Sequence, residues 1–366
     1  MAGGSGTRLW PASSSRLPKQ FLPADDKMSF FSLALERALA LSKRVIIITG
    51  EAHIPHVIAD ASKFSQADKK RIVVIGEPTA KNTAPAVACA VVFSGSCGQE
   101  TPDRDMLVLT SDHIIKPLKT FKTDAALAKK AAKSGGLVVF GIKPARPETG
   151  YGYIETAPEK NQEIKIPGVL KVAAFREKPD LETAKKYSAS KNFFWNSGMF
   201  AFNTDFMAKQ FSSHAKDVIE PFQKLKQPKA ADFSSQKGVK ILSKWKGLNT
   251  AYKTTKSISF DYAIAEKCEK TSMVSVNFDW IDIGNWEEYV KICGKCGSLV
   301  FNSGSNGCFV DSDIPVALAG VEDLIVVIRS GKNGNPAQAL VTRKGHTQNV
   351  KDIVEAIKKS GNTDLL

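Results

Sequence analysis

Residues 3–11 of this chain read Gly-Gly-Ser-Gly-Thr-Arg-Leu-Trp-Pro, and this segment guides the interpretation of the whole sequence. Three glycines within four residues let the backbone adopt positive φ angles and approach a ligand closely. Successive backbone amides in such a loop can converge on an anion. Arg8 and Lys19, the latter within Pro-Lys-Gln-Phe at 18–21, add positive charge. The segment predicts a phosphate-binding loop, with a tight surface turn as the alternative.

The loop matches neither of two common phosphate-binding patterns. It lacks the Gly-Lys-Ser/Thr end of a P-loop, and Leu9 breaks the glycine spacing of the dinucleotide-binding fold. Phosphate loops of α/β sheets normally follow a buried strand, but this loop begins at residue 3. One explanation is that the preceding strand is missing from the given sequence. If the protein starts at residue 1, we expect the sheet to lack a central strand and to be weakly stable.

The composition is that of an ordinary globular protein. The chain has 366 residues, 43% of them hydrophobic, which suffices for one large domain and a smaller one. No stretch reaches the ~18 apolar residues of a membrane-spanning helix, and no signal peptide is visible. Six scattered cysteines form no regular framework and favour a reducing compartment. We expect a cytoplasmic protein without a membrane partner.

The net charge of +14 raises the question of nucleic-acid binding. The lysines are dispersed over predicted helix faces, as at Lys129, Lys130 and Lys133, or lie in loops. No arginine-rich arm is present, and no basic segment alternates with aromatic residues. Dispersed lysines are typical of a solvated surface, so we expect no nucleic-acid partner.

Residues 1–293 show alternating helical and strand patterns. Helical periodicity occurs at 30–43, 53–64, 82–93 and 125–133, and β-branched or apolar runs occur at 45–49, 72–75, 106–110 and 137–140. Such alternation is typical of a mostly parallel sheet covered by helices on both faces. It predicts an α/β domain with a Rossmann-like, mixed but mostly parallel sheet.

Residues 294–366 have a different pattern. Short apolar runs at 299–301, 308–310, 316–319, 324–328 and 339–342 are separated by Gly, Asn, Ser and Asp. Apolar residues at helical spacing follow between 350 and 357. We predict a second, small β domain that is solenoid-like and ends in a helix.

Residues 77–86 read Glu-Pro-Thr-Ala-Lys-Asn-Thr-Ala-Pro-Ala and lead into the predicted helix. Asn82 and Thr83 open that helix, where free amides and an amide side chain can reach the edge of a base. The simpler interpretation of Asn82 is a helix cap, and Pro85 in the first turn agrees with it. Capping and base recognition are compatible.

Two aspartates follow strand-like runs and are candidates for a metal site. Asp112 ends the run 107–111, and ligands of open α/β sheets lie at the carboxyl ends of strands. Asp282 lies in Trp-Ile-Asp-Ile-Gly-Asn-Trp at 280–286. Two carboxylates with phosphate oxygens and waters are a normal Mg²⁺ environment. Taken alone, each aspartate is more simply a strand-end or turn residue, and we interpret His113 as structural.

Residues 3–11 and 18–21 closely resemble the signature of the mannose-1-phosphate guanylyltransferases (GDP-mannose pyrophosphorylases), which are sugar nucleotidyltransferases. The similarity continues to about Tyr289 and is looser beyond it. Lys81 stands where arginine is common, and Ile283 and Asn285 are further departures. The resemblance implies that residues 1–293 form a nucleotidyltransferase domain.

The resemblance also implies a reaction, in which GTP and mannose 1-phosphate give GDP-mannose and pyrophosphate. Arg8 and Lys19 are then the catalytic residues, and Asp112 and Asp282 hold Mg²⁺. The residues expected to bind the nucleotide are Gly3, Gly4, Ser5, Gly6, Thr7, Asn82, Thr83 and Asp112.

Further segments resemble the family's sugar-binding blocks. Residues 147–153 contribute Glu148 and Gly152, residues 175–179 contribute Glu177 and Lys178, and residues 195–200 contribute Asn196. The carboxylates and the amide are expected to bind sugar hydroxyls, and Lys178 the sugar phosphate. Each of these segments, taken singly, is more simply a turn or a solvated surface, so the prediction depends on their joint presence and order.

Two other functions remain open. One is a sugar nucleotidyltransferase that uses UTP or dTTP with glucose 1-phosphate. The other is a catalytically silent paralogue that binds a nucleotide-sugar and regulates a partner. The presence of Arg8, Lys19, Asp112 and Asp282 favours the enzyme. A homodimer formed through the small β domain is possible.

Overall fold

The computed structural model describes residues 1–4, 6–96, 104–161, 164, 166–293, 296–297, 299–331 and 336–366. Ser5, and residue 294 with which the second predicted domain begins, lie outside the described residues. No helix within the described ranges is long and apolar enough to cross a lipid bilayer.

A four-stranded sheet forms one part of the larger unit. Its strands, in spatial order, are β1 (Val45–Gly50), β2 (Ile72–Glu77), β10 (Val239–Leu242) and β9 (Phe233–Gln236). The first three are parallel, and β9 pairs antiparallel with β10. The helices between or beside these strands are α1 (Phe30–Leu41), α2 (Ile54–Ala61), α3 (Gln66–Lys69), α4 (Thr83–Ser96) and α9 (Leu248–Thr254). This half agrees with the parallel pairing expected from strand–helix alternation.

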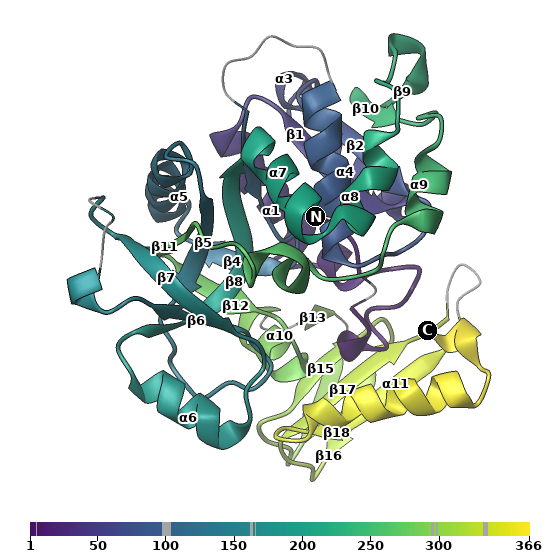
Figure 1. Cartoon of the computed structure of the whole chain (residues 1–366). Helices are drawn as coiled ribbons and strands as arrows, with labels where there is room; N and C mark the ends of the chain where they lie inside the picture. Colours follow the sequence, from purple (N-terminus) through teal and green to yellow (C-terminus); the bar gives the residue numbers. More distant parts are fainter. Residues whose placement is uncertain are drawn as a thin grey trace.

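A six-stranded sheet forms the other part (Figure 1). Its strands, in spatial order, are β3 (Asp105–Val108), β8 (Phe193–Asn203), β5 (Leu137–Ile142), β11 (Thr271–Ser275), β7 (Val169–Arg176) and β6 (Tyr153–Thr156). Only β5 and β11 are parallel, because β8 lies antiparallel between β3 and β5, and β6 and β7 are also antiparallel. The mixed α/β class is therefore confirmed, but this sheet is not mostly parallel. Alternation along the chain does not reveal that a late strand inserts between two earlier ones.

The remaining elements of the larger unit cover the sheets or connect them. They are β4 (His113–Lys116), α5 (Leu118–Ala132), α6 (Leu181–Ala189), α7 (Thr204–His214), α8 (Lys216–Gln223), β12 (Asp279–Asp282) and α10 (Trp286–Cys293). Local chemistry sets several helix starts: Ser29 caps α1, Asp180 caps α6 and Asn203 caps α7 by accepting backbone N–H groups. Helices α4, α7 and α8 pack on one another and enclose the largest core cluster.

The first two residues lie between the two sheets. The Met1 ammonium group donates to Leu109 O, just after β3, at 2.8 Å. Ala2 N donates to Ile48 O of β1, also at 2.8 Å, and Ala2 is buried. No ladder joins β1 to β3 among the described strands. In the structure, two residues that bridge the two sheets precede the glycine loop. This is the position at which we expected a central strand to be missing.

The C-terminal region is rich in β structure. Strands β13 (Cys296–Gly297), β15 (Phe309–Ser312), β17 (Leu324–Arg329) and β18 (Gln338–Arg343) form one sheet, and β14 (Val300–Ser303) and β16 (Val316–Ala319) form another. The pairs β13–β15, β15–β17 and β14–β16 are parallel, so alternate strands stack as in a short solenoid. Helix α11 (Val350–Lys359) lies along β15, β17 and β18 (Figure 1). The predicted β region with a terminal helix is confirmed.

Candidate active site

A cavity of about 420 Å³ lies beside the glycine loop and falls within the usual size range of small-molecule sites. Most residues that the sequence placed in a site line it: Gly3, Gly4, Gly6, Arg8, Lys19, Thr83, Asp112, Gly152, Glu177, Lys178, Asn196 and Asp282. Thr7, Asn82 and Glu148 are not among its lining residues. Segments from the whole length of the larger unit thus meet at one place.

The glycine loop has the backbone geometry that its composition requires. Gly4 and Gly6 have φ angles of 93° and 59°, which L side chains rarely adopt. A Cβ on Gly6 would lie 2.3 Å from Cβ of Lys19, so that position accepts only glycine. Ser13 Oγ donates to Gly6 O at 2.6 Å, and Gln20 Nε2 donates to Ala2 O at 2.9 Å. These bonds hold the loop against the segment that carries Lys19.

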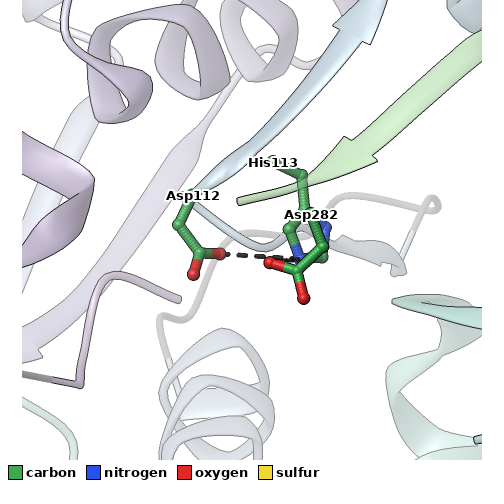
Figure 2. A group of neighbouring side chains, drawn as sticks. All are labelled: Asp112, His113 and Asp282. Atoms are coloured by element: carbon green, nitrogen blue, oxygen red, sulfur yellow. Dashed lines mark ion pairs between the residues drawn. The ribbon is translucent and has the colours of Figure 1, made fainter. Parts of the chain in front are cut away.

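The two aspartates come together through a pair of short strands. Strands β4 and β12 are antiparallel, and their register places Asp282 opposite His113. Asp112, the residue before β4, therefore lies beside Asp282, as Figure 2 shows. Asp112 and Asp282 are far apart in the sequence, and the pairing of β4 with β12 brings their carboxylates together.

Lys19 lies between the two aspartates. Its Nζ is 2.8 Å from Asp112 Oδ2, 3.3 Å from Asp282 Oδ1 and 2.8 Å from the carbonyl oxygen of Ile283. Burial alone would lower the pKa of Lys19, but the two carboxylates prevail and raise it. Burial alone would raise the pKa of Asp112, but the Lys19 charge holds it well below its usual range. The lysine is therefore cationic and Asp112 is ionised near neutral pH.

His113 presents an N–H group to the same carboxylates. Its Nε2 lies 3.7 Å from Asp112 Oδ1 and 3.7 Å from Asp282 Oδ1. Trp280 Nε1 donates to Nδ1 at 3.1 Å, and Thr110 Oγ1 lies 2.6 Å from Nδ1. Because an indole nitrogen can only donate, Nδ1 accepts and Nε2 carries the proton of the neutral ring. Burial lowers the pKa of His113, and this geometry agrees with a structural role.

The aspartates offer a donor set that fits a divalent cation. The possible ligand atoms of Asp112, His113 and Asp282 all lie within 4.8 Å of one another (Figure 2). Since His113 Nε2 is protonated, the available ligands are carboxylate oxygens, and hard divalent cations prefer oxygen. The site can therefore hold such a cation next to the phosphate loop.

A second group of polar side chains also lines the cavity. Asn196 Nδ2 donates to Asp261 Oδ1 at 2.7 Å, and Lys178 Nζ lies 3.0 Å from Glu177 Oε1. A Cβ on Gly152 would lie 2.6 Å from Glu177 Oε2, so glycine is needed there. Burial raises the pKa of Asp261, and the nearby Glu177 charge adds to the shift. This arrangement of acceptors suits a ligand with several hydroxyl groups.

Asp261 is a site residue that the sequence analysis did not select. It lines the cavity at the start of a single π-helical turn, Asp261–Ala265. It also directly contacts Asn196, which was predicted to bind the sugar. Its sequence signal was the block Ser-Phe-Asp-Tyr-Ala at 259–263, which resembles a further block of the family with Phe260 as a departure. The place of Asp261 in the site follows from its contact with Asn196 of β8, which the sequence alone does not reveal.

Three predicted site residues form hydrogen bonds or an ion pair with neighbouring residues. Glu148 Oε1 accepts from Gly150 N at 3.1 Å, and its Oε2 lies 3.3 Å from Arg146 Nη2. Asn82 Oδ1 accepts from Thr83 N, the first residue of α4, at 2.8 Å. Thr83 Oγ1 accepts from Phe260 N at 2.8 Å. The acceptor oxygens of Asn82 and Thr83 thus already have partners.

A glycine loop, a buried lysine and paired carboxylates around one cavity define a site for phosphoryl chemistry on a nucleotide. The family model described as "Nucleotidyl transferase" matches residues 1–296. The chain belongs to the nucleotidyl transferase family.

Individual relatives are similar to this chain over nearly all of its length. The chain is 34% identical to the mannose-1-phosphate guanylyltransferase of Escherichia coli, over all of this chain and 74% of that protein. It is 35% identical to the mannose-1-phosphate guanylyltransferase of Salmonella montevideo, over 98% of this chain and 73% of that protein. A solved structure described as mannose-1-phosphate geranyltransferase from Thermus thermophilus has a TM-score of 0.77 at 28% identity and 98% coverage of both chains. The resemblance drawn from the sequence is confirmed.

Proposed function

We propose that the chain transfers the guanylyl group of GTP to mannose 1-phosphate and releases pyrophosphate. The observation that carries this proposal is the Lys19 ammonium group, which lies between Asp112 and Asp282 beside the Gly3–Gly6 loop. One cation and two possible metal ligands beside a glycine loop suit the binding of phosphates. The names of the relatives supply the base and the sugar.

The reaction is an in-line displacement at phosphorus. An oxygen of the sugar phosphate attacks the α-phosphorus, the bond from that phosphorus to the β-phosphate oxygen breaks, and pyrophosphate leaves with the electron pair. The attacking oxygen is already ionised near neutral pH, so the site needs no general base. Its task is to align two polyanions and to neutralise their charge.

Each part of the site has a proposed share of this task. The loop amides, Arg8 and Lys19 bind and orient the triphosphate. Asp112 and Asp282 would hold Mg²⁺, which neutralises phosphate charge when it is bound. Lys19 contacts both carboxylates, so it also fixes their separation.

The part of the cavity lined by Gly152, Glu177, Lys178 and Asn196, called its sugar side, is proposed to hold the sugar. Glu177 and Asn196 accept or donate hydrogen bonds to hydroxyl groups, and Lys178 pairs with the sugar phosphate. Gly152 leaves room for the ring beside Glu177. Glu148 is a further proposed hydroxyl acceptor, through the capacity left beside the backbone N–H that its Oε1 accepts.

We also propose a cytoplasmic location and a homodimer. Support for a dimer comes from apolar side chains of the C-terminal region that are exposed to solvent, such as Leu299, Phe301 and Val341. Exposed apolar side chains gathered in one region are typical of interaction surfaces.

Pyrophosphate release in the presence of Mg²⁺ tests the function directly. GTP, UTP, dTTP and ATP are each combined with mannose 1-phosphate or glucose 1-phosphate. Release with GTP and mannose 1-phosphate alone is the expected result. Release with UTP or dTTP and glucose 1-phosphate would reassign the substrates. A folded protein that is silent with every pair would indicate the regulatory paralogue.

The variants Arg8→Ala and Asp282→Ala are expected to lower turnover by roughly 10²-fold or more, because each loses charge stabilisation of the transition state. Both side chains line the cavity, and Asp282 remains partly exposed, so the fold should survive both changes. Circular dichroism checks the fold. Near-normal turnover in either variant would remove that residue from the mechanism.

A further inference from the structure

His113 occupies the position of a third metal ligand beside the two aspartates. It is buried, and Arg37 Nη2 donates to its backbone oxygen at 3.0 Å, which holds the start of β4 in place. Its Nε2 lies 3.7 Å from a carboxylate oxygen of Asp112 and 3.7 Å from one of Asp282 (Figure 2). The possible ligand atoms of all three residues lie within 4.8 Å of one another. Two carboxylates and an imidazole at this spacing suit a transition metal such as Zn²⁺.

The tautomer of the imidazole decides whether it can join that ligand set. A ring nitrogen coordinates a metal only when it carries no proton. Trp280 Nε1 lies 3.1 Å from His113 Nδ1, and an indole N–H can only donate. The ring proton is therefore on Nε2, the nitrogen that faces the carboxylates. Thr110 Oγ1 lies 2.6 Å from Nδ1, but a hydroxyl group both donates and accepts, so of these two neighbours Trp280 fixes the tautomer.

Coordination through Nε2 is unfavourable while the indole is in place. The ring proton would have to occupy Nδ1, where it would face the indole N–H. Thr110 could accept from Nδ1, but the indole N–H would then lose its acceptor, and a donor left unpaired away from water is costly. Trp280 also packs edge-to-face against His113 and Tyr151, with ring centroids 5.1 and 5.4 Å apart. These contacts keep the indole from turning away.

We propose that Trp280 determines the metal specificity of the cation site, because its indole N–H keeps the proton of His113 on Nε2 and so excludes the imidazole from the coordination sphere. This inference rests on the proposed function, since it assumes that a divalent cation binds at Asp112 and Asp282. It gives Trp280 a role that acts on the cation through His113.

The exclusion of a nitrogen ligand favours the cations that suit phosphoryl transfer. Carboxylate, phosphate and water oxygens match Mg²⁺ and Mn²⁺, whereas an added imidazole strengthens the binding of Zn²⁺ more than that of either. One protein ligand fewer also leaves another coordination position for phosphate oxygens or water. Trp280 therefore keeps the site selective for hard cations even though a histidine lies next to it.

The test compares the wild type with Trp280→Phe, which keeps an aromatic ring beside Tyr151 and loses the indole N–H. Mn²⁺ bound to the full chain without nucleotide is followed by electron paramagnetic resonance while buffered Zn²⁺ displaces it. This titration gives the ratio of the two affinities at one site. The preference for Zn²⁺ over Mn²⁺ should be roughly 10- to 100-fold greater in Trp280→Phe, because the cost of the unpaired donor is removed.

The matched control is Trp245→Phe, which makes the same change at a buried tryptophan that does not line the cavity. Its indole N–H donates to Lys226 O at 2.8 Å, so this variant also loses a hydrogen bond. Its affinity ratio should equal that of the wild type. Thermal unfolding shows that both variants are folded.

A second measurement distinguishes imidazole coordination from a general loosening of the site. With Co²⁺ in place of Zn²⁺, ¹H NMR of Trp280→Phe should show the strongly shifted N–H proton of a coordinated imidazole. The wild type should show no such signal. Adding His113→Phe to Trp280→Phe should remove the signal and return the affinity ratio to about the wild-type value.

Each outcome decides the inference. An unchanged affinity ratio in Trp280→Phe would overturn it, as would a coordinated imidazole in the wild type. An equal gain of Zn²⁺ preference in Trp245→Phe would trace the effect to the loss of any tryptophan and would also overturn it. A wild type that binds no Mn²⁺ would overturn both the cation site and the role of Trp280. A lack of pyrophosphate release with every substrate pair would count against the proposed function alone, because the metal titration uses no substrate.

Discussion

The buried carboxyl group of Glu77 makes the stability of the unliganded protein depend on pH. Burial raises its pKa from 4.5 to about 7 in the folded state. The folded state therefore binds more protons than the unfolded state between these values, and stability falls as pH rises through them. Glu77→Gln cannot ionise and should lose this dependence.

The expected magnitude follows from the size of the shift. One pKa unit corresponds to about 1.4 kcal/mol, so a change from 4.5 to about 7 corresponds to about 3 kcal/mol. The free energy of unfolding of Glu77→Gln, relative to wild type, should rise by about this amount between pH 4.5 and pH 8. At the low end of that range the wild-type carboxyl is neutral, so the two proteins differ least.

Urea unfolding without nucleotide, repeated across this pH range, measures the difference. Among the groups facing Glu77, Cys89 and Tyr252 stay neutral because burial raises the pKa of both, that of Cys89 to about 12. The Met1 ammonium group titrates inside the range, since burial lowers its pKa to about 6. It is present in both proteins, so the comparison removes most of its contribution. A difference between Glu77→Gln and wild type that is flat with pH would refute the reasoning.

Three other changes have defined outcomes. Gly6→Ala places a Cβ 2.3 Å from Lys19 Cβ at a φ of 59°, so turnover should fall by roughly 10²-fold; near-normal kinetics would show that the loop tolerates a side chain. Trp280→Phe removes the donor to His113 Nδ1, and ¹⁵N NMR of the imidazole should then show both tautomers; a single unchanged tautomer would contradict the assigned role of the indole. Asp282→Asn removes one carboxylate from the cation site, and Mn²⁺ binding followed by electron paramagnetic resonance should weaken by roughly 10-fold or more. Unchanged Mn²⁺ affinity would place the cation elsewhere, and loss of turnover on chelation, restored by Mg²⁺, is the companion result.

The sequence predicted those features that depend on local pattern. Apolar periodicity located strands such as β1 and β2, and glycine spacing located the loop, because both signals lie within a few residues. The proximity of Asp112 and Asp282 was implied by family resemblance alone. Physically, it depends on the register of β12 against β4, which no single segment encodes.

Features that depend on long-range packing could not be predicted from the sequence. The antiparallel insertion of β8 between β3 and β5 is a matter of spatial order, and chain order does not report it. Asp261 belongs to the site because it contacts Asn196. Glu148 accepts a hydrogen bond from Gly150 N instead of lining the cavity. Asn82 fits both the cap and the base-binding patterns, and its bond to Thr83 N does not decide between them, because a capping side chain accepts from the second or third helical residue.

The position of the phosphate loop also depends on the far end of the chain. The Met1 N–Leu109 O and Ala2 N–Ile48 O bonds hold the backbone just before the loop, and further support for the loop comes from residues after it. Leu9 and Trp10 belong to the same buried cluster as Val350 and Val354 of α11. Trp10 Nε1 also donates to Leu365 O at 2.8 Å. A perturbation that loosens α11 should therefore reach the loop through Leu9 and Trp10 before it disturbs the sugar side of the cavity.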